Sequence, residues 1–207
     1  MPASSNIVVY VDAEGHNNLI GRVNRDVIVR HSAAVKNILD ANSNAEHVVL
    51  RAAPKGALEF VVGEVLRYHE RLYFNMSREP FERAVPILMA VQALGIQPEQ
   101  PQVEGHVVWE ICQNPLTPAR AELVAKASEF LGIDSKPFTN LVQRIGYDVV
   151  HDKITEEEKQ AFRNVAVRYP ALNDAIGVKV AYLRRLRNEH LDRVAQNAGR
   201  RRGDRRN

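Results

Sequence analysis

The order of short apolar segments in the first hundred residues constrains the fold more than any other feature of this sequence. Residues 7–11 and 19–23 are rich in β-branched residues, and the stretch between them contains a glycine and two asparagines, so they predict a β-hairpin. We expect a helix to follow over residues 32–39. After it we expect a lone strand over residues 48–50 that pairs with the hairpin. The first part of the chain is therefore expected to be α+β, with a three-stranded sheet and helices.

Three helices are expected in this part of the chain. The short helix begins at Ser32, a suitable N-cap. Its expected buried residues are Val35, Ile38 and Leu39. The apolar positions of the next helix follow helical spacing without a break: Leu58, Val61, Val62, Val65, Leu66 and His69. A third helix over residues 81–94 ends at Gly95, and Pro86 either bends it or marks its true start.

Several of these segments carry the short sequence patterns of a known family. Residues 32–39 read Ser-x-x-(apolar)-Lys-x-(apolar)-Leu, and residues 87–96 read (apolar)-Leu-(apolar)-Ala-x-x-x-Leu-x-(apolar). Together with the hairpin, the strand at residues 48–50 and the helix over residues 58–68, they resemble the BTB/POZ fold. The resemblance is to its small form, that of elongin C and related adaptors of cullin-type ubiquitin ligases, and it covers about half of the chain.

The resemblance implies a domain that binds other proteins. In elongin C and its relatives, the corresponding helix-and-loop region contributes to docking of cullin-type or substrate-receptor helices. The partners implied here are a cullin-type scaffold, a substrate receptor or a chromatin factor. Larger members of the family form homodimers shaped by an Asp and a His ahead of the first helix. Asp26 and His31 stand closer together in this chain, which leaves a homodimer as an open alternative.

A cluster of large side chains near the end of the second helix is the candidate partner-binding surface. Aromatic residues with polar tips are frequent anchors of protein interfaces. The residues of this candidate surface are Tyr68, Leu72, Tyr73, Phe74 and Trp109. The alternative is that these rings only cap the hydrophobic core.

The middle of the chain is expected to be helical. Thr117 and Pro118 are suited to start a helix that Gly132 ends, and Thr155 with Glu158 has the spacing of a capping box. The expected buried residues of this region are Leu123, Val124, Ala127, Phe130, Leu131, Leu141, Val142 and Ile145.

Residues 97–102 contain two prolines and three glutamines, a composition that suits an extended linker. They predict a boundary between two parts of the chain. The expected domains are a BTB/POZ-like domain over residues 1–98, a helical extension over residues 103–178, and a basic helix with a disordered tail over residues 179–207.

The carboxyl-terminal region differs in charge from the rest of the chain. Residues 180–207 contain nine arginines and three acidic residues, a net charge of +6, so the other 179 residues carry −3. A helix is expected here that ends at Gly199. The arginines expected to contact a nuclear-import carrier or nucleic acid are Arg184, Arg185, Arg187, Arg200, Arg201, Arg202, Arg205 and Arg206. The two clusters resemble a bipartite import signal, while contact with nucleic-acid phosphates and a solvated charge run are the alternatives.

The sequence contains no phosphate loop, dinucleotide fingerprint, nucleophile elbow or zinc-protease helix. His106 and Glu110 stand one helical turn apart but lack a convincing third metal ligand. Cys112 lies in an apolar stripe, where a cysteine is usually a small buried hydrophobe. We therefore expect no catalytic residue, no metal and no cofactor.

These observations predict a non-enzymatic adaptor or scaffold in a cullin-type ubiquitin ligase or a chromatin and transcription complex. The alternative is a nuclear, nucleic-acid-associated protein that acts through its arginine-rich tail. No apolar run approaches the roughly 18–20 residues of a membrane span, and one cysteine cannot form an internal disulfide. A nuclear or cytoplasmic location without membrane contact is therefore expected.

Overall fold

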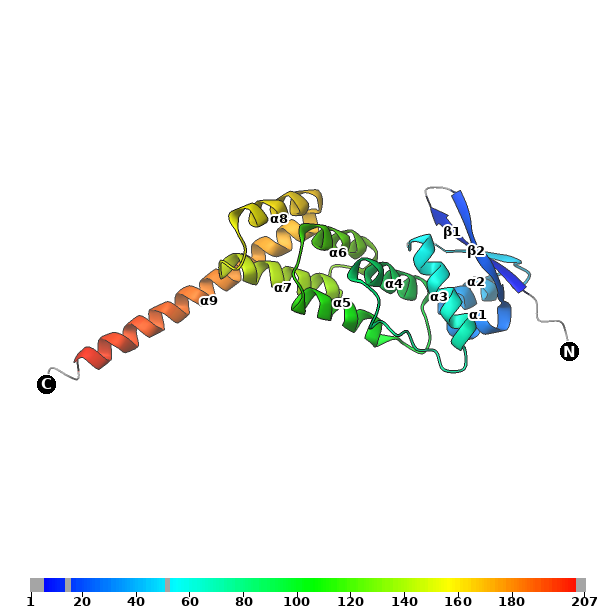
Figure 1. The fold of residues 1–207 in the computed structure, drawn as a ribbon, viewed down its shortest axis with the longest axis horizontal. Helices are drawn as coiled ribbons and strands as arrows, with labels where there is room; N and C mark the ends of the chain where they lie inside the picture. Colours follow the sequence, from blue (N-terminus) through cyan, green and yellow to red (C-terminus); the bar gives the residue numbers. More distant parts are fainter. Residues whose placement is uncertain (1–5, 14–15, 51–52, 204–207) are drawn as a thin grey trace.

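A three-stranded mixed sheet begins the fold and confirms the predicted pairing of the hairpin with the later strand. The computed structural model describes residues 6–13, 16–50 and 53–203. Strand β1 (Asn6–Ala13) pairs antiparallel with β2 (His16–Asn24) and parallel with β3 (His47–Leu50), which gives the strand order β2-β1-β3 (Figure 1). Glu14 and Gly15 of the expected hairpin turn lie outside the described residues.

Nine helices complete the described part of the chain. They are α1 (Arg25–His31), α2 (Ala33–Ala41), α3 (Lys55–Tyr68), α4 (Phe81–Leu94), α5 (Pro101–Gln113), α6 (Pro118–Leu131), α7 (Lys136–Val150), α8 (Glu156–Arg168) and α9 (Pro170–Gly203). The prediction of an α+β region followed by a largely helical region is confirmed. The sheet with α1–α3 forms one end of the molecule, α4–α8 form the middle, and α9 points away from the body (Figure 1). Over the residues described, none of these helices combines the length and the apolar character needed to cross a membrane.

Helix α1 is not predicted from the sequence, because packing here overrides a local preference. Its run Val27-Ile28-Val29 is β-branched, which lowers helix propensity. Asn24 nevertheless caps the helix, since its Oδ1 accepts hydrogen bonds from the N–H groups of Asp26 (3.0 Å) and Val27 (3.1 Å). Ile28 is fully buried, and α1 packs on α2, α3 and β2. The burial of this apolar side chain stabilises a helix that the local sequence disfavours.

The structure confirms three of the predicted helix ends, those at Ser32, Gly95 and Thr155. The Ser32 hydroxyl accepts from the Val35 N–H at 3.1 Å and caps α2. Thr155 and Glu158 form both bonds of the expected capping box, at 2.8 and 3.2 Å. Gly95 ends α4 in the left-handed conformation, with φ of +57°.

Helix α4 lies at the centre of the hydrophobic core. It begins at Phe81 and continues through Pro86, so Pro86 does not mark its start. The helix buries residues on several sides: Phe81, Ala84, Val85, Ile87, Leu88, Ala90, Val91 and Leu94. Because α4 packs against α2, α3, α5 and α6, one hydrophobic core continues from the sheet into the helices that follow. The expected boundaries between domains stay predictions.

Three residues that were expected in the core are more than a third exposed, so those predictions are wrong. They are Ile38, Leu66 and Phe130. Each stands at the edge of its helix's apolar stripe, where spacing alone does not show whether a neighbouring element covers it. Helix α6 instead packs through small residues such as Ala121 and Ala125.

The expected linker is packed against the body, and the prediction of an extended spacer is wrong. Helix α5 already begins at Pro101. The Gln97 N–H donates to the carbonyl oxygen of His31 at 2.8 Å. The side chain of Gln100 is buried, and its amide donates to the carbonyl oxygen of Leu72 at 3.3 Å. These hydrogen bonds hold the connection between α4 and α5 in place.

The variant Gly95→Ala is expected to lower the free energy of unfolding by about 1–2 kcal/mol, because an L-residue is strained at this positive φ. Its Cβ would also lie 3.2 Å from the Cβ of Ala33. Gly63→Ala is the control: Gly63 lies in α3 with open space around its Cβ position, and a gain of about 0.5–1 kcal/mol is expected. Chemical denaturation measures both changes, and effects of the same sign would contradict this account of Gly95.

Candidate functional site

Three of the five candidate residues, Tyr68 at the end of α3, Tyr73 in the segment after it and Trp109 in α5, are exposed, and we refer to them together as the aromatic surface. Their exposed fractions are 48%, 62% and 53%. The other two candidate residues, Leu72 and Phe74, are 8% and 0% exposed and lie in the core. A partner therefore cannot reach Phe74, which caps the core as the alternative interpretation expected. The binding role of the three exposed residues stays a prediction.

The segment after α3 has an alternating pattern that directs Tyr73 outward. Leu72, Phe74 and Met76 are buried, while the residues between them are exposed. This alternation is typical of an extended chain with one face on the core. The Phe74 ring also contacts the ring of Phe60 in α3, with centroids 6.4 Å apart. Tyr73 is thus exposed on a backbone whose neighbouring side chains are firmly packed.

Helix α5 and its N-cap residue, Gln100, also hold this segment. The Gln100 amide donates to the Leu72 carbonyl, and its Oε1 accepts from the Phe74 N–H at 3.4 Å. Further along the helix, His106 Nε2 donates to the carbonyl oxygen of Glu79 at 3.0 Å. These contacts attach the segment to α5 near both of its ends. They connect the backbone that carries Tyr73 to the helix that carries Trp109.

Trp109 is supported on the outer part of α5. The helix turns Val103, Val107 and Ile111 into the core, and Trp109 lies on a different side. The indole stacks on the ring of His106, with centroids 6.3 Å apart and an angle of 17° between the planes. Since His106 is hydrogen-bonded to the adjoining segment, the indole rests on a fixed neighbour. This arrangement suits a preorganised anchor for a protein partner.

His31 joins three segments of the chain. It is buried, with Nδ1 2.8 Å from the carbonyl oxygen of Gln97 and Nε2 2.8 Å from that of His69. Both neighbours are carbonyl oxygens, so each ring nitrogen of His31 lies within hydrogen-bond distance of an acceptor. His31 therefore connects the end of α1 to the segments after α3 and α4. Its side chain is engaged internally and is not presented to a second copy of the chain.

The side chains considered for catalysis or metal binding have separate structural partners. His106 binds the backbone of the segment after α3, as described above. Glu110 lies 3.4 Å from Arg120, and Cys112 Sγ lies 3.6 Å from Asn140 Oδ1. Within the part of the chain that the structure covers, no three His, Cys, Asp or Glu residues are grouped as metal ligands would be. Glu110 and Cys112 thus join α5 to α6 and α7, and His106 joins α5 to the segment after α3.

The first arginines of the tail have different surroundings. Arg187 is bound to the body, since its Nη1 donates to the carbonyl oxygen of Val150 at 2.5 Å. Arg185 faces Glu189 at 3.7 Å on the exposed side of α9. Arg184 lines a groove between helices. The three residues thus differ in their availability to an import carrier or to nucleic acid.

Helix α9 continues to Gly203, so the prediction that Gly199 ends it is wrong. A disordered tail beginning at residue 200 is wrong for the same reason. One glycine costs a helix only about 1 kcal/mol, which neighbouring helix-forming residues offset. Arg200, Arg201 and Arg202 lie within α9, although their side chains are outside the described part, and Arg205 and Arg206 lie beyond the described residues altogether. A role for these arginines in import or nucleic-acid contact stays a prediction.

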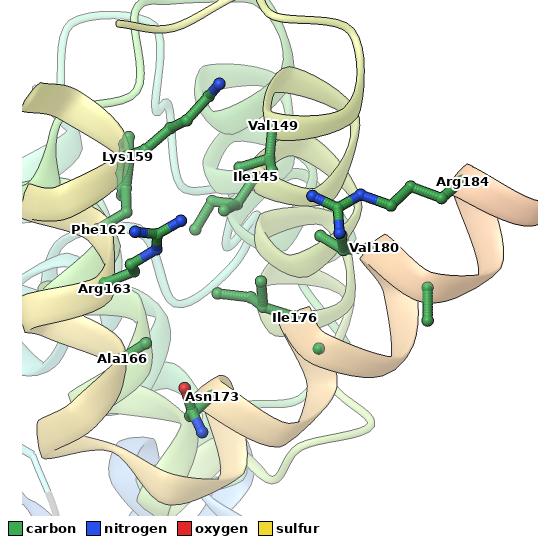
Figure 2. Close-up of a pocket in the computed structure, with 12 residues that line it drawn as sticks. Ile145, Val149, Lys159, Phe162, Arg163, Ala166, Asn173, Ile176, Val180 and Arg184 are labelled. Atoms are coloured by element: carbon green, nitrogen blue, oxygen red, sulfur yellow. The ribbon is translucent and has the colours of Figure 1, made fainter. Parts of the chain in front are cut away.

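A groove between α7, α8 and α9 was not predicted from the sequence (Figure 2). It has a volume of about 370 Å³. Its lining includes Ile145 and Val149 of α7, Phe162 and Arg163 of α8, and Ile176, Val180 and Arg184 of α9. These residues come from three helices and share no local motif. Only the packing of the helices brings them together.

Comparison of the sequence with models of known protein families, and with characterised proteins, gives no match. The aromatic surface, the basic helix and the groove are thus the features from which a function can be argued.

Proposed function

We propose that this protein is a non-enzymatic adaptor or scaffold that binds a protein partner through its aromatic surface. The observation that carries the proposal is the exposure of Tyr73 and Trp109 on a firmly held backbone. Ring side chains lose little conformational entropy on binding, and tyrosine and tryptophan are enriched among the residues that dominate interface energies. A fixed segment beneath them lowers the entropic cost further.

The order of elements supports an adaptor of the BTB/POZ type. A hairpin, short helices, a third strand and then α3 and α4 follow one another as in the fold that the sequence resembles. The aromatic surface begins at Tyr68, the last residue of α3, in the helix-and-loop region that the resemblance associates with docking. The partner proposed on this ground is a cullin-type scaffold, a substrate receptor or a chromatin factor.

The double variant Tyr73→Ala/Trp109→Ala is expected to lose its protein partners. Full-length protein is immobilised, nuclease-treated cell extract is passed over it, and bound proteins are quantified by mass spectrometry. A partner recovered in this way is then purified and titrated, and its Kd is expected to rise at least about 10-fold for the double variant. Tyr182→Ala is the matched control, because Tyr182 is a similarly exposed aromatic residue on α9.

The arginine-rich helix supports a second candidate function, contact with nucleic acid. Helix α9 points away from the body, and the side chains of Arg185 and Arg193 on it are 69% and 76% exposed (Figure 1). In the same capture experiment, replacement of Arg193 and Arg200–Arg202 by glutamine separates the two functions. Partners that survive this change and depend on the aromatic residues support the adaptor. Partners lost with the arginines or with nuclease would contradict it and favour nucleic acid.

A further inference from the structure

The groove between α7, α8 and α9 has an apolar floor and basic edges. Its floor is formed by Ile145 and Val149 of α7, Phe162 of α8, and Ile176 and Val180 of α9. Lys159, Arg163 and Arg184 stand around this floor, and α8 and α9 diverge on either side of it (Figure 2). The combination suits a ligand with an apolar side and adjacent negative charge.

Two of the three basic residues are available for such a ligand. Lys159 already binds Glu156 at 2.7 Å and Asp152 at 3.1 Å. These hydrogen bonds raise the pKa of Lys159, and the bond with Lys159 lowers the pKa of Asp152, so Lys159 and Asp152 are both charged at neutral pH and offset each other. Arg163 and Arg184 are exposed, and among the described residues neither has an ion pair or a hydrogen bond.

The two available arginines stand on opposite sides of the groove. Arg163 belongs to α8 and Arg184 to α9, and both guanidinium groups point toward the space between these helices (Figure 2). Two guanidinium groups facing one opening favour carboxylates, which they can bind in bidentate geometry. The charge of the groove is therefore complementary to aspartate or glutamate side chains.

The shape of the groove favours a polypeptide segment over a small molecule. The groove continues into a second, more polar hollow of about 600 Å³, which shares Val149, Lys159, Arg163 and Arg184 with the first. Both hollows open to solvent, whereas a small-molecule site encloses most of its ligand. A helix that lies in a groove buries only its apolar face and leaves the opposite face in water.

We propose that the groove between α7, α8 and α9 binds an amphipathic helix of a partner protein. Apolar side chains of that helix lie on the half-buried Val149, Ile176 and Val180, above the buried Ile145 and Phe162. Its acidic side chains bind Arg163 and Arg184. This site lies on helices other than those of the aromatic surface. It adds a second docking site to the adaptor, and it can hold or fail independently of the proposed function.

Selection of helical peptides against the full chain tests this site. A phage library of random peptides of about 16 residues is long enough for four helical turns. The selected peptides are expected to share apolar residues at i, i+3, i+4 and i+7, flanked by Asp or Glu. Fluorescence anisotropy then compares the full chain with Arg163→Glu/Arg184→Glu, for which Kd should rise at least about 10-fold. The milder Arg163→Gln/Arg184→Gln should show a smaller rise in the same direction.

Arg185→Glu is the matched control, because Arg185 is adjacent in sequence but faces Glu189 instead of the groove. Its Kd is expected to change less than about twofold. The methyl NMR signals of Ile145 and Ile176 should shift on peptide addition, and the spectra of the variants show that they are folded. Tyr73→Ala/Trp109→Ala should bind the peptides normally, which separates this site from the aromatic surface.

Several outcomes would overturn the proposal. Recovery of no peptide, of peptides without acidic residues, or of peptides that bind the charge-reversed variant equally well would exclude an acidic helix as the occupant. Methyl shifts confined to other residues would place the binding elsewhere. Shifts of Ile145 and Ile176 with sodium dodecanoate, but with no selected peptide, would identify the groove as a site for a small amphiphile.

Discussion

The variant Phe74→Ala is expected to lower the free energy of unfolding by about 3–5 kcal/mol. Phe74 is fully buried and lies against Phe60, so the truncation removes apolar contacts and leaves a cavity in the core. Chemical denaturation monitored by circular dichroism measures the change. A loss of this size is a large fraction of the stability of an ordinary domain, so a lower yield of folded protein is also expected.

Tyr73→Ala is the matched control for this measurement. Tyr73 is the neighbouring residue in sequence, yet 62% of its side chain is exposed. Its truncation should change the free energy of unfolding by less than about 0.5 kcal/mol. Similar losses for the two variants would mean that the alternation of buried and exposed residues in this segment is not the one described here. Partner binding, in contrast, should respond to Tyr73→Ala.

The variant His31→Ala should lose about 3 kcal/mol of stability, because the buried imidazole and its contacts with two backbone carbonyl groups are removed. Those carbonyls belong to Gln97 and His69, on segments that follow different helices. His31→Gln is expected to lose less, since an amide can still donate to one of the two. Chemical denaturation measures both losses, and hydrogen exchange should show the largest increase in the segments around residues 69–74 and 97–100.

His69→Ala provides the contrast with His31→Ala. His69 contributes its backbone carbonyl to the contact, and its own ring makes only a 3.4 Å contact with Leu66 O. Truncation of this ring should therefore cost less than about 1 kcal/mol. A loss as large as that of His31→Ala would contradict this account, because it would mean that the ring of His69 holds the segment after α3 as strongly as the ring of His31 does.

The elements that the sequence predicts correctly are those whose signals lie within a few neighbouring residues. The hairpin, α3 and α4 were predictable because alternation, helical spacing and the stop at Gly95 each span only a few residues. Ser32 and Thr155 were identifiable as caps for the same reason. Helix α1 was missed because Ile28 is stabilised by contacts with elements distant in sequence, which no local propensity contains.

The candidate site was only partly predictable. Its exposed aromatic residues were included in the prediction, but Leu72 and Phe74 were grouped with Tyr73 as if adjacent residues shared one surface. The period-two pattern of Leu72, Phe74 and Met76 was present in the sequence and could have separated them. The groove had no such signal, since its three walls meet only through the packing of α7, α8 and α9.

The continuity of α9 gives the backbone of residues 188–203 a defined position relative to the body. Arg187 is attached to Val150, and the helix continues for another 16 residues to Gly203. At 1.5 Å per residue, this part of the helix is about 24 Å long. A partner that binds near its end would therefore be held at a set distance and direction, as by a strut. A flexible chain of equal length would allow a broad range of separations.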